Sequence, residues 1–532
     1  MVSAGAVGMS FFADACHPRR ARDLSCRSES FSPTAGSQFQ RTAPGAGILN
    51  FATLKFSSRM PPLSHLLSAG ELAAQIRRRA ISPVEAARAH LDRIERLNPR
   101  LNAFVDCQPE AVLAQAREAD NAIERGDELG PLHGVPVSIK SSIAVALHRW
   151  EAGSRLRAGH IARQDAPLVR RLRAAGAVIL GVTNTPELLM AWETDNVLYG
   201  RTNNPWDLSR TAGGSSGGEA SAIAAGLSAG GVGSDGGGSI REPAHFCGIC
   251  GLKPTPGRIP TTGHYPKSGG PFALLGVVGP MARTVADLQI LFRAMAGADD
   301  GDPCAAPVEV REVGDRQLLR TGIGFFEDDA RTPVTPETRE AVRQAALILM
   351  SCGFRVDAFR PEGLEQARQR WWEWFGVAGG MILEPELRGH EHQLSPILGE
   401  FRGWTQSAPA PTGESLLATW LERDALREKF LRQMRKYPVL VCPVAAIPAF
   451  RHGERQWQVE GQTVKYLDAW SYCEWFNLLG FPAAVVPMGH AKDGLPIGVQ
   501  IVGRPWEEEI VLAVAAKLEA EREAWQAPPL AD

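Results

Sequence analysis

The sequence has 532 residues, of which 44% are hydrophobic and 22% are charged, and these proportions are ordinary for a folded globular enzyme. Its formal net charge of -2 gives no reason to expect binding to nucleic acid or to an anionic membrane surface. The chain contains no apolar run of about 18 residues, so we expect no integral membrane association, and its nine cysteines are too scattered for a disulfide scaffold, which favours the cytoplasm.

Residues 1–59 differ from the rest of the chain, because they are rich in Ser, Arg, Gly and Pro and poor in acidic residues. They do not show the charged start, apolar middle and cleavage site of a signal peptide in that order. Regularly patterned sequence begins soon after Met60. We therefore expect residues 1–59 to be a disordered extension or to precede the true start of translation.

The segment that follows alternates between helical and strand-like patterns. Residues 63–125 are expected to form an opening layer of helices, and within them residues 82–85 read Ser-Pro-Val-Glu, a capping box with proline at the first helical position. Short apolar runs at residues 135–139 and 177–182 then flank a helical stretch at 167–174. This alternation predicts an α/β fold whose sheet is covered by helices on both faces.

Lys140 ends the apolar run 135–139, in a chain where only nine of 57 basic side chains are lysine. Burial among apolar groups lowers the pKa of a lysine because it disfavours the charged form, and a neutral lysine can act as a base. A lysine at a strand end more commonly extends its ammonium group to solvent. The residue alone leaves both interpretations open.

Two tracts rich in glycine and serine, residues 213–218 and 236–241, surround hydroxyl groups with bare backbone N–H groups. Such amides can stabilise the negative charge that develops on the oxygen of a tetrahedral intermediate, and glycine permits the close approach. A nucleophilic Ser239 would need a base to take its proton. His245 is near in sequence, but it lies in an apolar segment, where a single histidine is more often a packed core residue.

Residues 300–475 are less regular and more charged, and eight of the thirteen tryptophans lie in residues 371–475. Strand-like runs return at residues 483–486 and 497–502, and a closing helix follows them. The chain contains no internal repeat, and the late strands are expected to rejoin the first sheet. We expect one domain at residues 60–525, with residues 300–475 as a lid or substrate-pocket insertion.

Together these features resemble the amidase signature family. Residues 213–219 (GGSSGGE) and 233–243 (GSDGGGSIREP) resemble the family signature and keep its usual spacing between the two serines. Residues 134–140 resemble the family's lysine strand, and residues 246–255 resemble the segment after its nucleophile. The similarity extends over residues 63–520. It implies the amidase signature fold, in which a single large mixed β-sheet forms the core.

The resemblance implies an amidase that hydrolyses the C–N bond of a linear carboxylic amide to an acid and ammonia or an amine. In the implied Ser-Ser-Lys triad, Ser239 is the nucleophile that forms an acyl-enzyme, Ser215 relays the proton and neutral Lys140 is the base. The implied oxyanion hole consists of the amides of Gly236, Gly237, Gly238 and Ser239, and the implied supporting residues are Ser216, Asp235 and Arg241. A cis peptide bond is implied at Gly214–Ser215. The family requires no metal or other cofactor.

One position departs from the family pattern. Ser141 stands where many relatives have an acidic residue after the lysine. This affects the surroundings of the triad rather than its three members.

Other interpretations of the same residues are weaker. Residues 213–217 fit the GxSxG elbow of α/β-hydrolases, which requires a preceding strand, but residues 203–210 are polar and interrupted by proline. Residues 231–236 fit GxGxxG, but no acidic residue stands about 20 positions further on. His390 and His392 could suggest a metal site, yet further ligands are lacking.

Within the family, the alternative is the A-type subunit of a tRNA-dependent amidotransferase, which works with partner subunits. Residues 267–276 do not resemble what we expect of such a protein, so we favour a stand-alone hydrolase of a small-molecule amide, which could be a homodimer. A further hypothesis concerns the tryptophans of residues 371–475. They could line an acyl pocket for apolar or aryl amides, or they could pack the lid against the sheet.

Overall fold

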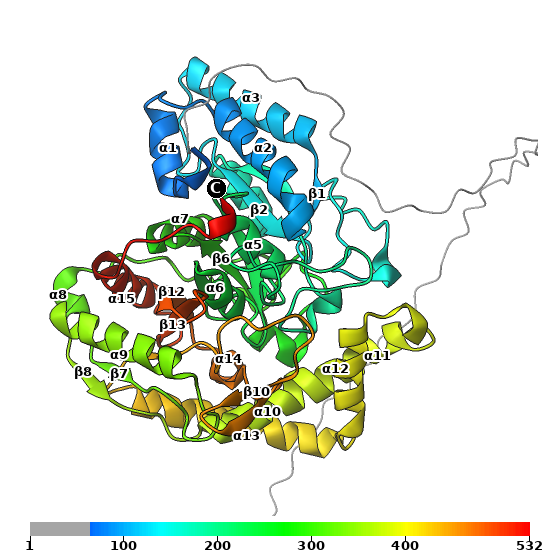
Figure 1. Ribbon diagram of the computed structural model, residues 1–532, viewed down its shortest axis with the longest axis vertical. Helices are drawn as coiled ribbons and strands as arrows, with labels where there is room; N and C mark the ends of the chain where they lie inside the picture. The colour runs from blue at the N-terminus through cyan, green and yellow to red at the C-terminus, as the bar shows by residue number, and fades with distance from the viewer. Residues whose placement is uncertain (1–63, 532) are drawn as a thin grey trace, which may run out of the picture. The chain divides into compact units, whose positions relative to one another are not determined.

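An eleven-stranded mixed sheet organises residues 64–531, the part of the chain that the computed structural model describes (Figure 1). The expected extension at residues 1–59 lies outside the described residues. In sheet order the strands are β1 (Phe104–Cys107), β3 (Val178–Thr183), β2 (Pro136–Lys140), β4 (Gly230–Asp235), β6 (Val277–Ala282), β5 (Cys250–Lys253), β12 (Ala483–His490), β13 (Pro496–Val502), β9 (Val439–Pro443), β7 (Ile323–Phe325) and β8 (Val356–Ala358).

The strand directions make the sheet mixed, as expected. β2 runs parallel to β3 and β4, and β7 runs parallel to β8 and β9. The remaining pairs are antiparallel. The late strands β12 and β13 join the sheet beside β5, so the prediction that they rejoin the first sheet is confirmed.

Both faces of the sheet are covered, because strand side chains alternate between two cores. In β12, Ala484 and Val486 belong to one apolar cluster and Val485 to another. The first cluster contains α1 (Ala69–Arg77), α4 (Pro167–Ala174), α7 (Val285–Met295), α9 (Pro336–Ser351) and α15 (Glu508–Glu521). On the opposite face lie α5 (Gly217–Ala224) and α6 (Arg241–Cys247), with α14 (Ser471–Leu478) against them.

The opening layer of helices comprises α1, α2 (Pro83–Leu101) and α3 (Pro109–Arg125). The predicted capping box begins α2: the Ser82 hydroxyl accepts from the Glu85 amide at 3.1 Å, and the Glu85 carboxylate accepts from the Ser82 amide at 2.8 Å. The short strand β1 between α2 and α3 was not predicted. It pairs only with β3, at the end of the sheet.

Residues 300–475 contain more of the central sheet than expected, since β7, β8 and β9 all belong to it. β7 and β8 have three residues each at the sheet edge, too few to give a recognisable apolar run. Besides α9 and a short 3-10 helix (Glu391–Gln393), the elements of this segment outside the sheet are α8 (Asp315–Leu318), α10 (Leu364–Trp371), a π-helix (Trp372–Ala378), α11 (Gly379–Leu387), α12 (Pro396–Ser407), α13 (Gly413–Gln433) and the hairpin β10 (Gln456–Val459) and β11 (Gln462–Lys465). We retain the lid as a proposal for residues 364–433.

Among residues 64–531, none of the helices combines the length and the apolar composition that crossing a lipid bilayer demands.

Candidate active site

The sequence-predicted residues meet where β2 and β4 end and where α5 and α6 begin. β2 and β4 are parallel neighbours, so their carboxyl ends, which carry Lys140 and Asp235, share one edge of the sheet. Ser215 lies just before Ser216, the N-cap of α5, and Ser239 lies just before Ile240, the N-cap of α6. Two strand ends and two helix starts therefore bring the tracts around residues 140, 215 and 239 together.

The amine of Lys140 contacts three serine hydroxyls. Its Nζ lies 2.6 Å from the Oγ of Ser215, 3.0 Å from that of Ser216 and 3.0 Å from that of Ser234. Sequence reasoning did not assign a role to Ser234, although it lies within the signature. Its hydroxyl completes the set of partners around the lysine.

Lys140 is fully buried, at 0% exposure. Burial holds the pKa of its amine well below the ordinary value, and the nearby carboxyls of Asp235 and Glu219 oppose this only in part. A neutral amine has one lone pair and two N–H bonds, so it can accept a proton from one hydroxyl while it donates to others. The geometry thus places a fully buried amine with a lowered pKa beside the hydroxyl of Ser215.

Ser215 and Ser239 line the same cavity, which has a volume of about 320 Å³. The amide of Ser216 donates to the carbonyl of Ser239 at 3.2 Å and ties the two tracts together. The Gly214–Ser215 peptide bond is cis, as the resemblance implies. The amide of Gly214 donates to the carboxyl of Glu242 at 2.9 Å, a contact that sequence reasoning missed.

Asp235 and Arg241 form a fully buried ion pair at 3.0 Å. The Asp235 carboxylate also accepts from the amides of Gly238 at 2.8 Å and Ile240 at 3.1 Å. Burial alone would raise the pKa of Asp235, but the Arg241 guanidinium holds it well below its usual range. These contacts tie Asp235 to the loop that carries Ser239.

The glycine tract contains backbone amides that form no hydrogen bond with the described residues, and two of the residues that carry them, Gly236 and Ser239, line the cavity. The carbonyls of Gly236 and Gly237 accept from the indoles of Trp371 at 2.8 Å and Trp192 at 2.9 Å. The carbonyl of Gly236 and the N–H of Gly237 belong to the same trans peptide and point in opposite directions. The Gly237 amide therefore points away from Trp371. Within residues 64–531, no hydrogen bond uses the amides of Gly236, Gly237 or Ser239, whereas the Gly238 amide is occupied by Asp235.

Side chains cannot be added at the first two glycines without a clash. A Cβ on Gly236 would lie 2.5 Å from the ring of Phe375, and a Cβ on Gly237 would lie 2.4 Å from the ring of Trp371. These two rings stack on each other, with centroids 4.9 Å apart. The aromatic pair therefore packs directly behind the candidate oxyanion tract.

The cavity that contains the serines is mainly apolar. Its apolar lining consists of Leu188, Leu189, Met190, Phe272, Val277, Phe375, Ile382 and Leu383. Phe375, Ile382 and Leu383 come from residues 371–475, as the lid hypothesis expects, but none of that segment's eight tryptophans lines this cavity. Instead, most of these rings pack against one another in one apolar cluster.

The histidines weighed as alternatives take no part in the site. His245 is buried, its Nε2 lies 3.1 Å from the carbonyl of Ile447, and its Nδ1 accepts from the amide of Gly498 at 2.8 Å. Burial lowers the pKa of His245 to about 4, so it is a packed core residue, as predicted. His390 and His392 are exposed, and the described residues contain no cluster of three or more side chains suited to hold a metal ion.

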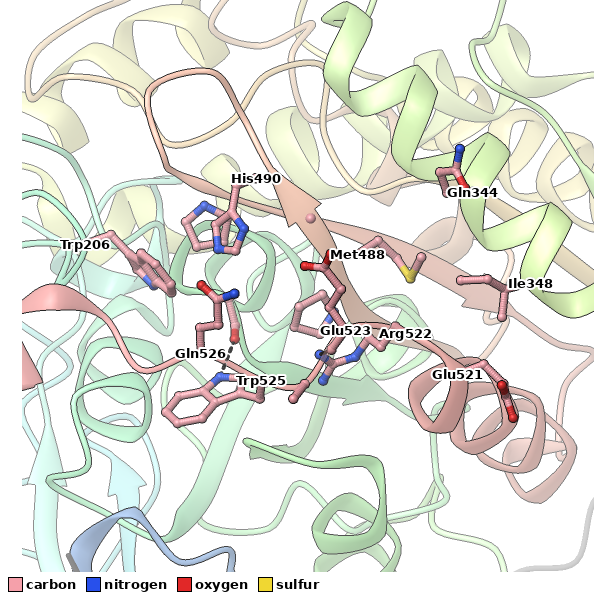
Figure 2. Close-up of a pocket in the computed structure, with 15 residues that line it drawn as sticks. Trp206, Gln344, Ile348, Met488, His490, Glu521, Arg522, Glu523, Trp525 and Gln526 are labelled. Atoms are coloured by element: carbon pink, nitrogen blue, oxygen red, sulfur yellow. Dashed lines mark hydrogen bonds between the residues drawn. The ribbon is translucent and has the colours of Figure 1, made fainter.

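A separate cavity of about 350 Å³ lies among Trp206, His490, Trp525 and the residues around Arg522 (Figure 2). Both of its indoles donate to backbone carbonyls, Trp206 to Cys247 and Trp525 to Gly248. It contains none of the residues around Lys140. We therefore assign no chemistry to it.

Comparison with known proteins identifies the family. The chain matches the Amidase family over residues 85–512. It belongs to the amidase signature family. The match covers most of the chain and spans all the residues of the site, so the resemblance drawn from the signature is confirmed.

Among its relatives, an indoleacetamide hydrolase from Bradyrhizobium diazoefficiens is 35% identical over 85% of this chain and 86% of that protein. The A-type subunit of a glutamyl-tRNA(Gln) amidotransferase from Carboxydothermus hydrogenoformans is 34% identical over 87% of this chain and 99% of that protein. In structure, a bacterial aryl acylamidase of the amidase signature family is similar, with a TM-score of 0.78 and 27% identity over 88% of this chain and 99% of that one. The amidase signature fold is therefore confirmed, and the chain is an amidase-family enzyme.

Proposed function

We propose that the protein hydrolyses the C–N bond of a carboxylic amide through an acyl-enzyme on Ser239. The observation that supports this most is the fully buried Lys140, whose Nζ lies 2.6 Å from the Oγ of Ser215. A lysine in this setting is neutral and can take a proton, which an exposed lysine at neutral pH cannot do.

In acylation, Lys140 takes the proton of Ser215, and Ser215 takes the proton of Ser239. The Ser239 oxygen then attacks the amide carbonyl carbon, and a C–O bond forms as the carbonyl oxygen becomes negatively charged. The free amides of Gly236, Gly237 and Ser239 stabilise that oxygen. The loss of one such donor typically costs about 2.7 to 4 kcal/mol of transition-state stabilisation. We leave Gly238 out of the oxyanion hole, because Asp235 holds its amide.

Collapse of the tetrahedral intermediate breaks the C–N bond. Ser215 gives its proton to the leaving nitrogen, and ammonia or an amine departs. Water then attacks the acyl-enzyme with the same relay as base, and the acid is released. Ser216 and Ser234 hold the amine of Lys140 in place, since both hydroxyls lie 3.0 Å from it.

The substrate is proposed to be a small amide with an apolar or aryl group. Apolar side chains such as Leu188, Phe272 and Leu383 line most of the cavity that contains Ser239, and such walls favour apolar groups. The names of the indoleacetamide hydrolase and aryl acylamidase relatives are consistent with this class. We propose a cytoplasmic location, which free, buried cysteines such as Cys247 and Cys442 favour.

The direct test measures hydrolysis of a panel of aliphatic, aryl and peptide amides by the purified protein. The wild-type enzyme should release acid and amine from apolar or aryl amides, and Ser239→Ala should abolish turnover without unfolding. A uniform preference for short polar amides would contradict the substrate class. Full activity of Ser239→Ala would contradict the nucleophile.

The second candidate is an amidotransferase A-type subunit, which the 34% identity to the glutamyl-tRNA(Gln) amidotransferase protein favours. The two candidates differ in whether companions are needed. Hydrolysis of an amide by the purified chain alone supports the stand-alone enzyme. Activity that appears only with companion proteins and tRNA would support the alternative.

A further inference from the structure

A third cavity, of about 400 Å³, is lined by Trp371 and shares no lining residue with the cavity that contains Ser239. Its lining residues come from α10, the π-helix, α12, α14 and the segment around β10 and β11. Its walls include Trp371, Trp372 and Trp404. Three of the tryptophans expected to line an acyl pocket thus line this cavity instead.

A buried carboxyl in this cavity accepts no hydrogen bond from the described residues. Glu474, on α14, is 2% exposed and lines the cavity. Within residues 64–531, no side chain or amide donates a hydrogen bond to its carboxyl or forms an ion pair with it. Burial raises the pKa of Glu474 well above its ordinary value, and Arg368 counteracts this only in part. An unpaired buried carboxyl costs free energy unless an occupant of the cavity satisfies it.

Aromatic rings surround the space that faces this carboxyl. Tyr466 joins the three tryptophans in the lining, and its ring lies 5.9 Å from that of Trp404. The face of an aromatic ring carries partial negative charge and attracts cations. Ring faces and a carboxyl together favour a positively charged ligand that also has an apolar part.

The positive side chains in the lining are largely neutralised within the protein. Arg368 is held by Glu365 at 3.1 Å, and Arg455 is held by Glu400 at 2.7 Å and by Glu193 at 2.8 Å. Lys465 is exposed, so water screens its charge. Asp468 lies 3.5 Å from Arg368. Glu474 is therefore the buried carboxyl in the lining that forms neither a hydrogen bond nor an ion pair with the described part of the chain.

We propose that this cavity binds a small organic ammonium ion, whose N–H groups donate to Glu474 and whose carbon skeleton packs against Trp371, Trp372 and Trp404. The site is distinct from the catalytic cavity and does not depend on the proposed amide hydrolysis. It adjoins that cavity, however, because the indole of Trp371 also donates to the carbonyl of Gly236 at 2.8 Å.

Isothermal titration calorimetry of the full chain tests this proposal with three probes of similar shape: 2-phenylethylammonium, neutral 2-phenylethanol and anionic 3-phenylpropanoate. We expect the ammonium ion to bind at least about tenfold more tightly than the other two probes. A charge-assisted hydrogen bond together with ring contacts contributes at least that factor. Equal binding of the alcohol would overturn the proposal. So would no binding of the ammonium ion, because the cavity would then hold solvent only.

Variants locate the binding. Glu474→Gln should weaken ammonium binding at least about tenfold, and Trp404→Ala should weaken it even if Glu474→Gln fails to fold. Ile382→Ala, a matched control in the wall of the catalytic cavity, should leave the affinity unchanged. Unchanged affinity in both Glu474→Gln and Trp404→Ala would overturn the proposal, as would loss of binding in Ile382→Ala. None of these readouts requires turnover, so they are independent of the proposed amidase activity.

Discussion

At the scale of single residues, two buried lysines differ in whether their hydrogen-bond partners carry a proton. Lys140 and Lys253 are both 0% exposed, and burial lowers the pKa of both, that of Lys253 to about 7. Lys253 donates to the carbonyl of Pro254 at 3.1 Å, which has no proton to give. Lys140 contacts hydroxyls, and only this arrangement can pass a proton to a nucleophile.

Lys140→Ala should reduce kcat by about 100- to 10,000-fold, the usual contribution of general acid–base catalysis. Catalysis requires the neutral amine, so wild-type activity is present above the lowered pKa of Lys140 and is lost as the pH falls through it. The pH profile of the variant should lack this acidic limb, the fall of activity at low pH. The pH dependence of kcat/KM, measured for both enzymes, checks this prediction. An unchanged acidic limb in the variant would exclude Lys140 as the base.

Glu242 is expected to position the relay serine. It is 1% exposed, and its carboxyl accepts from the amide of Gly214, the residue before Ser215. Burial raises the pKa of Glu242 well above its ordinary value, which favours the neutral acid. Removing this acceptor leaves the Gly214 amide without its buried partner, which typically costs about 1 to 3 kcal/mol.

Glu242→Ala should therefore lower kcat at least about tenfold with little change in KM, whereas Glu242→Gln should keep most activity because its amide oxygen still accepts from Gly214. Steady-state kinetics separate the two parameters, and circular dichroism checks that both variants fold. Equal losses in the two variants would show that the hydrogen bond to Gly214 is not what matters.

At the scale of elements, the π-helix at Trp372–Ala378 and the end of α10 position the rings that back the glycine tract. Trp371 and Phe375 stack nearly parallel, at 13°. One ring fills the space beside Gly237 and the other fills the space beside Gly236. The shape of the candidate oxyanion hole thus depends on a helical segment more than 100 residues away in the sequence.

Gly236→Ala should lower kcat/KM at least about tenfold, because its Cβ would lie 2.5 Å from Phe375 and would displace an oxyanion donor. Adding Phe375→Ala removes the atoms it meets, so the double variant should recover part of the loss. The coupling between the two sites is measured by a double-mutant cycle. Simple additivity of the two single effects would contradict the packing account.

At the scale of the whole molecule, Arg241 joins the nucleophile loop to the C-terminal strands and helices. Its guanidinium donates to Asn477 on α14 and to Gln500 on β13, residues more than 200 positions away. The late strands that rejoin the sheet therefore hold the loop that carries Ser239. The loop that carries Ser239 is therefore held in place only when the C-terminal part of the chain has folded.

Arg241→Met should destabilise the fold by about 3 to 5 kcal/mol, because it leaves the Asp235 carboxylate buried without its cation. Urea unfolding measures the change. Arg241→Met combined with Asp235→Asn should recover part of the stability, since the uncompensated charge is gone. A loss below about 1 kcal/mol in the single variant would mean that the pair behaves like an exposed salt bridge.

Local motifs made it predictable that Lys140 and Ser215 lie together, with the Asp235–Arg241 pair beside them, because the motifs that carry these residues are contiguous in the sequence. The capping box of α2 was predictable for the same reason. The contacts of Trp371, Phe375 and Asn477 with the glycine tract were not, since they join segments from distant parts of the sheet and of the helical layer. The lining of the catalytic cavity could not be predicted either, because a tryptophan-rich segment does not reveal which face each ring covers.

The central claim is that a neutral Lys140 activates Ser239 through Ser215, and the pH-dependent rate of labelling by a fluorophosphonate tests it most directly. Peptide mapping should find the label on Ser239. The labelling rate should fall in acid for the wild-type enzyme and should be far lower in Lys140→Ala and Ser215→Ala at every pH. A label on any other residue, or equally fast labelling of Lys140→Ala, would contradict the account.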